Sequence, residues 1–482
     1  MKFLSLAVPC LLFFLCGCGP TTAEILARHE QELITGNLSA SLPLLNQAAE
    51  RNDNDLLLWH LLSGTANSLT GNSAESIRQF DLAEDLFSRN DHQSVFEQGG
   101  EGALAMLQNE KVFQFNGNGQ DRIFCCFYKA LNYAASSNPD AARTELNRAM
   151  EHQENWLYAR KKEIASAAET LEKGLAENQN QSNDSQAEAA AAVTIAKDKN
   201  FLNLLVEHCS FDLQKNGDIG KLTPADYQNA YITHFSGVFR WLNGDGGREY
   251  IRDAAGLKPG HPILSADFSD IEAGKIPDNT VWIYAEDGLC PKRKEVRLDL
   301  PFILIPYANH YILYAGMAFP ALHYQSAAAD KYTVSAAGSV FPMIELENFD
   351  RLVKTEYDVY MYGAVKREIA RCLLKAGVQA GLGIAAEKAS DKWVKLGLRA
   401  AQVTAATHAA ASTSADTRTW ISLPKRIMVV RITRPEDGKI TINADSHSIA
   451  LDLPAGNSIV WLRKTAVSSP LQAKIIHFSA RK

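Results

Sequence analysis

The sequence has no strongly basic segment and none of the common catalytic motifs. Its formal net charge is −6, and no run of Lys and Arg is long enough to form the positive surface that nucleic acids require. It lacks His-Glu-x-x-His, Cys-x-x-Cys, Gly-x-Ser-x-Gly and the phosphate-binding Gly-x-x-x-x-Gly-Lys. Its 12 histidines are scattered singly. We therefore expect no nucleic-acid partner, no metal, no cofactor and no enzymatic activity.

Cysteine is sparse and irregularly spaced. Beyond residue 18 the chain has Cys125, Cys126, Cys209, Cys290 and Cys372. An odd number at irregular spacing does not fit the disulfide framework of a small secreted domain. We expect most of these side chains to be small buried apolar groups, and a single disulfide in an oxidising compartment stays open as the alternative.

The N-terminus carries the clearest indication of where the protein resides. Lys2 precedes an apolar run over residues 3–15, which is too short to span a bilayer and has the length of a signal-peptide core. Leu15-Cys16-Gly17-Cys18 resembles a bacterial lipobox, and this resemblance implies cleavage after residue 17 and acylation of Cys18. An ordinary secretory signal and a buried helix are the alternatives.

No later segment offers about 20 consecutive apolar residues, so we expect a lipid anchor rather than a transmembrane span. Gly19 follows the acylated position in place of Asp. By resemblance to enterobacterial sorting, this residue implies the outer membrane, with the protein facing the periplasm.

The N-terminal half repeats a pattern of paired helices. The clearest units cover residues 55–87 and 122–150, and weaker units cover 22–50 and 230–257. Small residues such as Gly64 stand where two helices would cross, which resembles the tetratricopeptide pattern. Stacked pairs of this kind leave a concave face that commonly binds peptides or proteins. The alternative is a set of α-hairpins with no groove in use.

After residue 258 the chain becomes mixed. Residues 281–285 have the pattern of a buried strand and 296–300 that of a half-exposed strand, while residues 348–376 return to helix. Residues 377–411 are rich in Ala and Gly and are interpreted as a tightly packed helix pair. The last part contains strand-length runs at 426–433, 439–443, 448–452, 457–463 and 473–478, separated by turn residues, which suggest a small sandwich or barrel-like sheet.

These patterns predict an α+β multidomain protein, in which an α-helical tetratricopeptide-like repeat region precedes a mixed α/β region and a small all-β module. The expected divisions are a signal peptide (1–17), a helical repeat domain (18–258), a mixed strand-rich region (259–346), a helical Ala/Gly-rich segment (347–414) and a C-terminal β module (415–482).

Two charged clusters stand at the expected junctions. Adjacent acidic residues end the strand near 285, and an Asp-x-Arg pair precedes a tryptophan near 420. An Asp two residues before an Arg can fix a turn through its backbone amide while the Arg pairs elsewhere. We interpret both clusters as clamps between domains, with a partner-binding surface or a catalytic site as alternatives. The candidate residues are Glu286, Gly288, Pro291, Lys292, Arg371, Asp416, Arg418 and Trp420.

The order of features resembles an uncharacterised family of bacterial envelope lipoproteins with a tetratricopeptide-like N-terminal half. The matching segments are 127–133, 260–262, 286–292, 319–320 and 415–420. This resemblance implies a location and a layout, and it carries over no reaction.

Together these features lead us to expect an anchored periplasmic scaffold, or an assembly or regulatory factor, that binds an envelope protein. The alternative is an envelope hydrolase or transferase acting on cell-wall or surface glycans, with Glu286 and Asp287 as acid and base. Adjacent residues of one strand point to opposite faces, which counts against this pair. A third reading is a purely architectural spacer.

Overall fold

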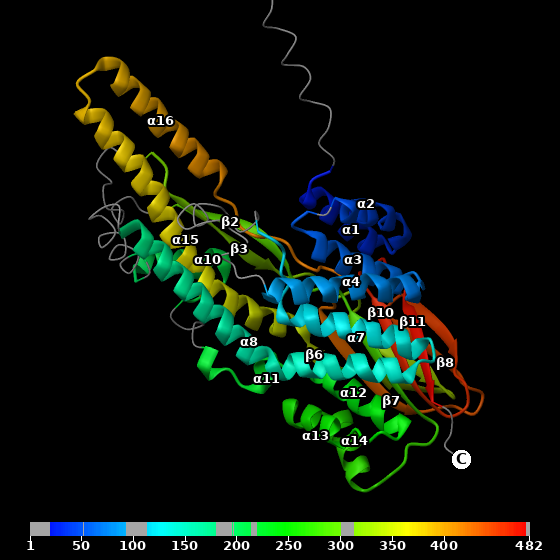
Figure 1. The fold of residues 1–482 in the computed structure, drawn as a ribbon. Coiled ribbons are helices and arrows are strands. Elements are labelled where there is room, and N and C mark those ends of the chain that lie inside the picture. The colour runs from blue at the N-terminus through cyan, green and yellow to red at the C-terminus, as the bar shows by residue number, and fades with distance from the viewer. Residues whose placement is uncertain are drawn as a thin grey trace, which may run out of the picture.

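The computed structural model of the chain describes residues 20–51, 53–92, 113–179, 195, 197–213, 219–299 and 313–478. The predicted leader and the acylation position Cys18 lie outside these residues. The described fold is α+β, as predicted: a helical region is followed by strands, two long helices and a C-terminal β region (Figure 1).

The helical region contains antiparallel pairs at the predicted positions. The helices are α1 (Thr22–Thr35), η2 (Leu38–Ala40), α2 (Leu42–Glu50), α3 (Leu56–Leu69), α4 (Ser73–His92), α7 (Gly119–Ala135), α8 (Pro139–Gln179), α10 (Lys199–Cys209), η4 (Ile219–Lys221), α11 (Pro224–Tyr227), α12 (Ala230–Asn243), α13 (Arg248–Leu257) and α14 (Pro262–Glu272).

The crossing of α3 and α4 shows why a small residue is needed there. A Cβ atom added to Gly64 would lie 2.6 Å from the Phe80 ring, so only glycine permits this approach. The turn that follows places Gly71 at a φ of +85°, a conformation that favours glycine.

The helical region extends past the predicted boundary at residue 258. Residues 258–261 break the helical pattern between α13 and α14, but the chain then begins another helix instead of a strand. The His261 ring accepts a hydrogen bond from the backbone amide of Leu264, and Pro262 stands in the first turn. Proline suits this position because its missing N–H would have no partner within the helix.

The strands form three sheets. The strands are β1 (Thr280–Asp287), β2 (Lys292–Asp299), β3 (Gly316–His323), β4 (Tyr332–Ala336), β5 (Ser339–Pro342), β6 (Ile344–Asn348), β7 (Arg426–Thr433), β8 (Lys439–Ala444), β9 (His447–Asp452), β10 (Asn457–Lys464) and β11 (Gln472–Phe478). One sheet has the order β11-β10-β1-β7-β6, a second has the order β5-β4-β8-β9, and β2 pairs with β3.

The five predicted C-terminal strands are confirmed, but they pair with strands of the central region. β1 lies between β10, to which it is parallel, and β7, to which it is antiparallel. β8 pairs with β4 in the four-stranded sheet. Both sheets contain strands from before and after residue 415. A domain boundary at this residue would therefore cut through both sheets.

The layers are helices, five-stranded sheet and four-stranded sheet. Along β1, Trp282 and Tyr284 belong to the core shared with the helices, whereas Val281 and Ile283 belong to the core between the two sheets. This alternation is the period of two that a strand buried on both faces requires. The helices and the five-stranded sheet share one core, so the side of α7 and α12 that faces the sheet is covered.

The long helices α15 (Phe349–Lys388) and α16 (Lys392–Ala411) form a hairpin that projects from the layered body (Figure 1). Between Tyr357 and Ala380, α15 packs on β2, β3 and α10 through a separate core that includes Phe319. Within the described chain, α15 alone has the length and apolar content to cross a membrane, and 67% of its most apolar window is buried in the protein.

Candidate functional site

The end of β1 carries the two acidic residues that the sequence singled out. Glu286 and Asp287 are both fully buried. Because neighbouring strand residues face opposite ways, Glu286 points to the helices and Asp287 to the four-stranded sheet. The two carboxylates therefore have separate sets of partners, and the expectation that they face apart is confirmed.

Glu286 is held between two helices and a strand. Its Oε2 accepts a hydrogen bond of 2.8 Å from the Tyr128 hydroxyl of α7, and its Oε1 accepts one of 3.1 Å from the Tyr231 hydroxyl of α12. Arg463 of β10 lies 3.8 Å from Oε2 through its Nε. Burial raises the pKa of Glu286, and the Arg463 guanidinium opposes that shift. Burial also raises the pKa values of both tyrosines, which keeps their hydroxyls protonated as donors.

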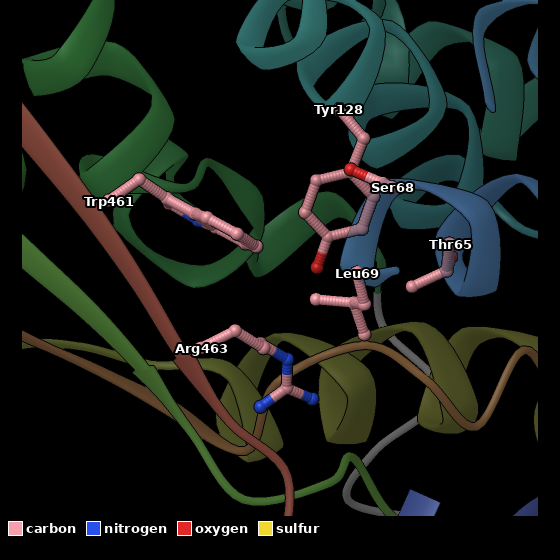
Figure 2. Close-up of a pocket in the computed structure, with 6 residues that line it drawn as sticks. All are labelled: Thr65, Ser68, Leu69, Tyr128, Trp461 and Arg463. Carbon is pink, nitrogen blue, oxygen red and sulfur yellow. The ribbon is translucent and has the colours of Figure 1, made fainter. Parts of the chain in front are cut away.

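The space beside this cluster is a narrow crevice between α3, α7 and β10. Figure 2 shows the Tyr128 hydroxyl directed toward the Arg463 guanidinium, with Trp461 from the same strand beside it. The α3 side is lined by Thr65, Ser68 and Leu69, and the crevice is too narrow for a water molecule. No substrate group can reach Glu286 through it in this conformation.

Asp287 closes a junction on the other side of the sheet. Its Oδ1 accepts a hydrogen bond of 2.8 Å from the Tyr332 hydroxyl and bonds from the backbone amides of Ala328 and Ala329. Its Oδ2 accepts a 2.8 Å bond from Nε of Arg426. These contacts join β1 to β4 and β7, and they use both oxygens of the carboxylate.

The residues that follow β1 make the predicted turn. Gly288 has a φ of +70°, and its amide donates to the carbonyl of Lys464. Pro291 immediately precedes β2. Lys292 pairs with Glu30 of α1 at 2.6 Å. This turn therefore connects the sheet to the first helix of the chain.

The second cluster joins the C-terminal region to the N-terminal helices. Arg418 donates two 2.8 Å hydrogen bonds to the Asp416 carboxylate, and its own amide also donates to Asp416. Its Nη1 donates to Asp55 beside α3 and to the carbonyl of Phe113. Trp420 is buried, and its Nε1 donates a 3.0 Å bond to Thr65.

Arg371 is not part of either of these two clusters. It lies on α15, where it is buried and pairs with Glu368 one turn earlier. Glu286 is bonded by Tyr128 and Tyr231, and Asp416 is bonded by Arg418, so these two carboxylates have different partners.

Sequence reasoning missed a second buried polar network, centred on Asp267 of α14. His234 Nε2 and Trp282 Nε1 donate to its Oδ2 at 2.8 and 2.9 Å, and Arg431 donates to its Oδ1 at 2.6 Å. The other ring nitrogen, Nδ1 of His234, lies at a hydrogen-bonding distance of 2.9 Å from the Tyr284 hydroxyl. All the side chains except Arg431 are fully buried. An acid, a histidine and a hydroxyl in this order resemble a catalytic relay. However, Tyr284 is fully buried, so its hydroxyl does not reach solvent.

One group of side chains has the composition of a metal site. The ligand atoms of Glu84, Cys126 and Glu145 lie within 4.8 Å of one another. The Lys129 ammonium already lies among them, 2.5 Å from Glu84, 3.0 Å from Glu145 and 2.8 Å from Asp81. Burial raises the pKa of the Cys126 thiol, which disfavours the thiolate that binds metals. The Lys129 ammonium thus supplies the positive charge that a metal ion would otherwise bring. Its ion pairs join α4, α7 and α8.

The five described cysteines, Cys125, Cys126, Cys209, Cys290 and Cys372, are all buried and free. The expectation that most are small core residues is confirmed for this part of the chain.

Replacement of Arg418 by lysine is expected to lower the free energy of unfolding by about 2 kcal/mol. A lysine keeps the charge but cannot make the paired bonds to Asp416 while reaching Asp55. Urea denaturation measures the change. A loss below about 0.5 kcal/mol, the range of an ordinary surface substitution, would contradict this account.

His29 is expected to make stability depend on pH. It is fully buried on α1, and burial lowers its pKa to about 4 from an ordinary value of 6.5. Its stabilising contribution is complete above pH 6.5 and is lost as the pH falls through about 4, because the unfolded chain binds the proton first. The loss is about 3 kcal/mol, since one pKa unit corresponds to about 1.4 kcal/mol. The free energy of unfolding is measured at the two ends of this pH range for the unsubstituted chain and for His29→Gln. We expect the unsubstituted chain to lose more stability than the variant as the pH falls, by that amount. An equal loss in the two proteins would refute the prediction.

Comparison with family models, with curated proteins and with solved structures found no match for this chain. The resemblance to envelope lipoproteins therefore stays a prediction, and the roles of individual residues rest on their geometry.

Proposed function

We propose that this protein is a lipid-anchored, non-catalytic scaffold of the bacterial envelope. In this proposal, acylated Cys18 holds the folded body at the periplasmic side of the outer membrane. The body then presents a rigid surface to an envelope protein, as an assembly or regulatory factor would. The anchor raises the effective concentration of the body near a partner in the same membrane.

The observation that carries the proposal is the complete burial of the candidate acid and base. A glycosidase needs two carboxyl groups about 5 to 9 Å apart that flank one open cleft. Glu286 and Asp287 point to opposite faces of a sheet, and protein donors occupy both carboxylates. These contacts fix helices to sheets, which favours a supporting role over hydrolysis of a glycan.

The outer side of the helical region offers the proposed contact surface. The helices pack on the five-stranded sheet through one side, and we take their opposite side as the contact surface. Tyr158 of α8 is 73% exposed, whereas tyrosine is on average intermediate between buried and exposed residue types. We choose Tyr158 as the position at which to probe this surface, because of its high exposure.

The test is photocrosslinking in living cells from an unnatural residue placed at Tyr158. Val467, in the loop between β10 and β11, is 64% exposed and provides the matched control position. We expect one reproducible covalent adduct with an envelope protein from position 158 and none from position 467. Equal adducts at both positions, or none at either, would oppose the proposal.

A second experiment tests the alternative that the protein is a hydrolase. The purified chain is incubated with isolated peptidoglycan, and released fragments are measured. We expect no release. Release that disappears in Glu286→Gln and Asp287→Asn variants that remain folded would replace the scaffold proposal with the enzymatic one.

A further inference from the structure

The outer end of the α15–α16 hairpin exposes a set of large apolar side chains. Residues 391–397, at the start of α16, are all exposed. Among them, Trp393 is 77% exposed, Val394 54% and Leu396 60%. Apolar side chains that occur singly on a surface need no explanation, but three within four residues at the end of a projection do.

The apolar character continues along the solvent face of α16. Trp393, Leu396, Ala400 and Val403 are three or four residues apart and therefore share one side of the helix. All four are exposed. The opposite side of α16, which includes Ala406, is buried, and α16 packs against α15. The helix α16 therefore has a second apolar side, and no described residue of the chain covers it.

The charge on this helix differs in sign from that of the whole chain. The sequence of α16 contains no Asp or Glu, and it contains Lys392, Lys395 and Arg399. The whole chain has a net charge of −6. Exposed Trp and Leu flanked by basic residues are the combination that binds the interface of a bilayer containing anionic lipids.

The tip also lies where a membrane contact is sterically feasible. Figure 1 shows the tip projecting beyond the layered body, at the end of the hairpin away from the five-stranded and four-stranded sheets. This projection leaves the tip open to the approach of a flat surface.

We propose that the tip of the α15–α16 hairpin, residues 388–403, is a membrane contact that inserts Trp393 and Leu396 into the interfacial region of an anionic bilayer. The lysines of the tip lie against the lipid headgroups, and the apolar rings and chains lie just below them. This contact does not depend on acylation of Cys18, and it goes beyond the scaffold role proposed above.

The test uses a chain that begins at Gly19, which removes the leader and the acylation position. Every described core residue is retained, because the first of them is Ile25. Sedimentation with vesicles measures the partition coefficient. We expect binding to vesicles of equal parts phosphatidylglycerol and phosphatidylcholine, and much weaker binding to phosphatidylcholine alone.

Two variants separate the apolar and electrostatic contributions. The double substitution Trp393→Ser with Leu396→Ser is expected to reduce partitioning by at least roughly tenfold, since both side chains would otherwise leave water. Lys392→Gln with Lys395→Gln is expected to reduce binding to the anionic vesicles by roughly fivefold for each charge removed.

The matched control changes two apolar residues of similar exposure elsewhere. Ile276→Ser with Val467→Ser alters side chains that are 73% and 64% exposed, and it should leave vesicle binding unchanged. The thermal unfolding midpoints of the tip and control variants should equal that of the unsubstituted chain, because none of these side chains is buried.

Three results would overturn the proposal: no binding by the unsubstituted chain, an equal loss in the tip and control variants, or a dimer in the absence of lipid that the tip substitution dissociates. The last result would assign the apolar face to a second copy of the chain. Since this chain cannot be acylated, failure here leaves the scaffold proposal intact, and an absence of acylation in cells leaves this proposal intact.

Discussion

Replacement of Glu286 by alanine is expected to lower the free energy of unfolding by about 3 to 5 kcal/mol. The substitution leaves Arg463 as a buried cation without its carboxylate, and it removes the acceptor from the Tyr128 and Tyr231 hydroxyls. Buried donors without partners cost more than the bonds themselves contribute. Guanidinium chloride denaturation, followed by far-ultraviolet circular dichroism, measures the change.

Two milder variants provide controls for this result. Glu286→Gln keeps the shape and one acceptor oxygen, so its loss should be smaller than that of the alanine variant. Tyr128→Phe removes one hydroxyl and should cost about 1 kcal/mol. If Glu286→Ala were as stable as the unsubstituted chain, Glu286 would not be the residue that joins the helical layer to the sheet.

Replacement of Asp267 by alanine should have an effect of similar size, about 3 to 5 kcal/mol. This carboxylate accepts from His234, Trp282 and Arg431, and the first two of these side chains are fully buried. Its removal leaves the buried ring nitrogens of His234 and Trp282 without their partner, and it takes away one of the two carboxylates that pair with Arg431. The same denaturation measurement applies.

Asp270 is the matched control because it lies one turn further along α14 and also pairs with Arg431, at 2.7 Å. Its side chain is more exposed and pairs as well with Lys275 on the surface. Surface ion pairs contribute about 0 to 1 kcal/mol, so Asp270→Ala should cost no more than that. Equal losses for the two aspartates would show that the effect follows Arg431 rather than the buried network.

The secondary structure was largely predictable because it depends on local patterns. Strand-length runs between turn residues predicted β7 over 426–433 with the observed bounds, and β10 to within one residue. The paired helices were predicted from small residues at crossings such as Gly64. The break between Leu257 and Pro262 is also present, but it separates two helices, because Pro262 suits the first turn of α14.

The pairing of distant segments could not be predicted from these patterns. β1 and β10 lie side by side although about 170 residues separate them in the sequence, and no local signal specifies a parallel neighbour. The same limit applies to the site. Glu286 was identified as a candidate from its position after a strand, but its partner Tyr128 is 158 residues away. His234 and Asp267 carry no motif, so their network emerges only from the packing of α12, α14 and β1.

The central claim is that a lipid at Cys18 holds this non-catalytic body at a membrane. Metabolic labelling with an alkyne fatty acid, in bacterial cells that express the full chain or its Cys18→Ser variant, tests it most directly. The account predicts label on the unsubstituted protein and none on the variant. Equal label on both proteins, or none on either, would contradict it.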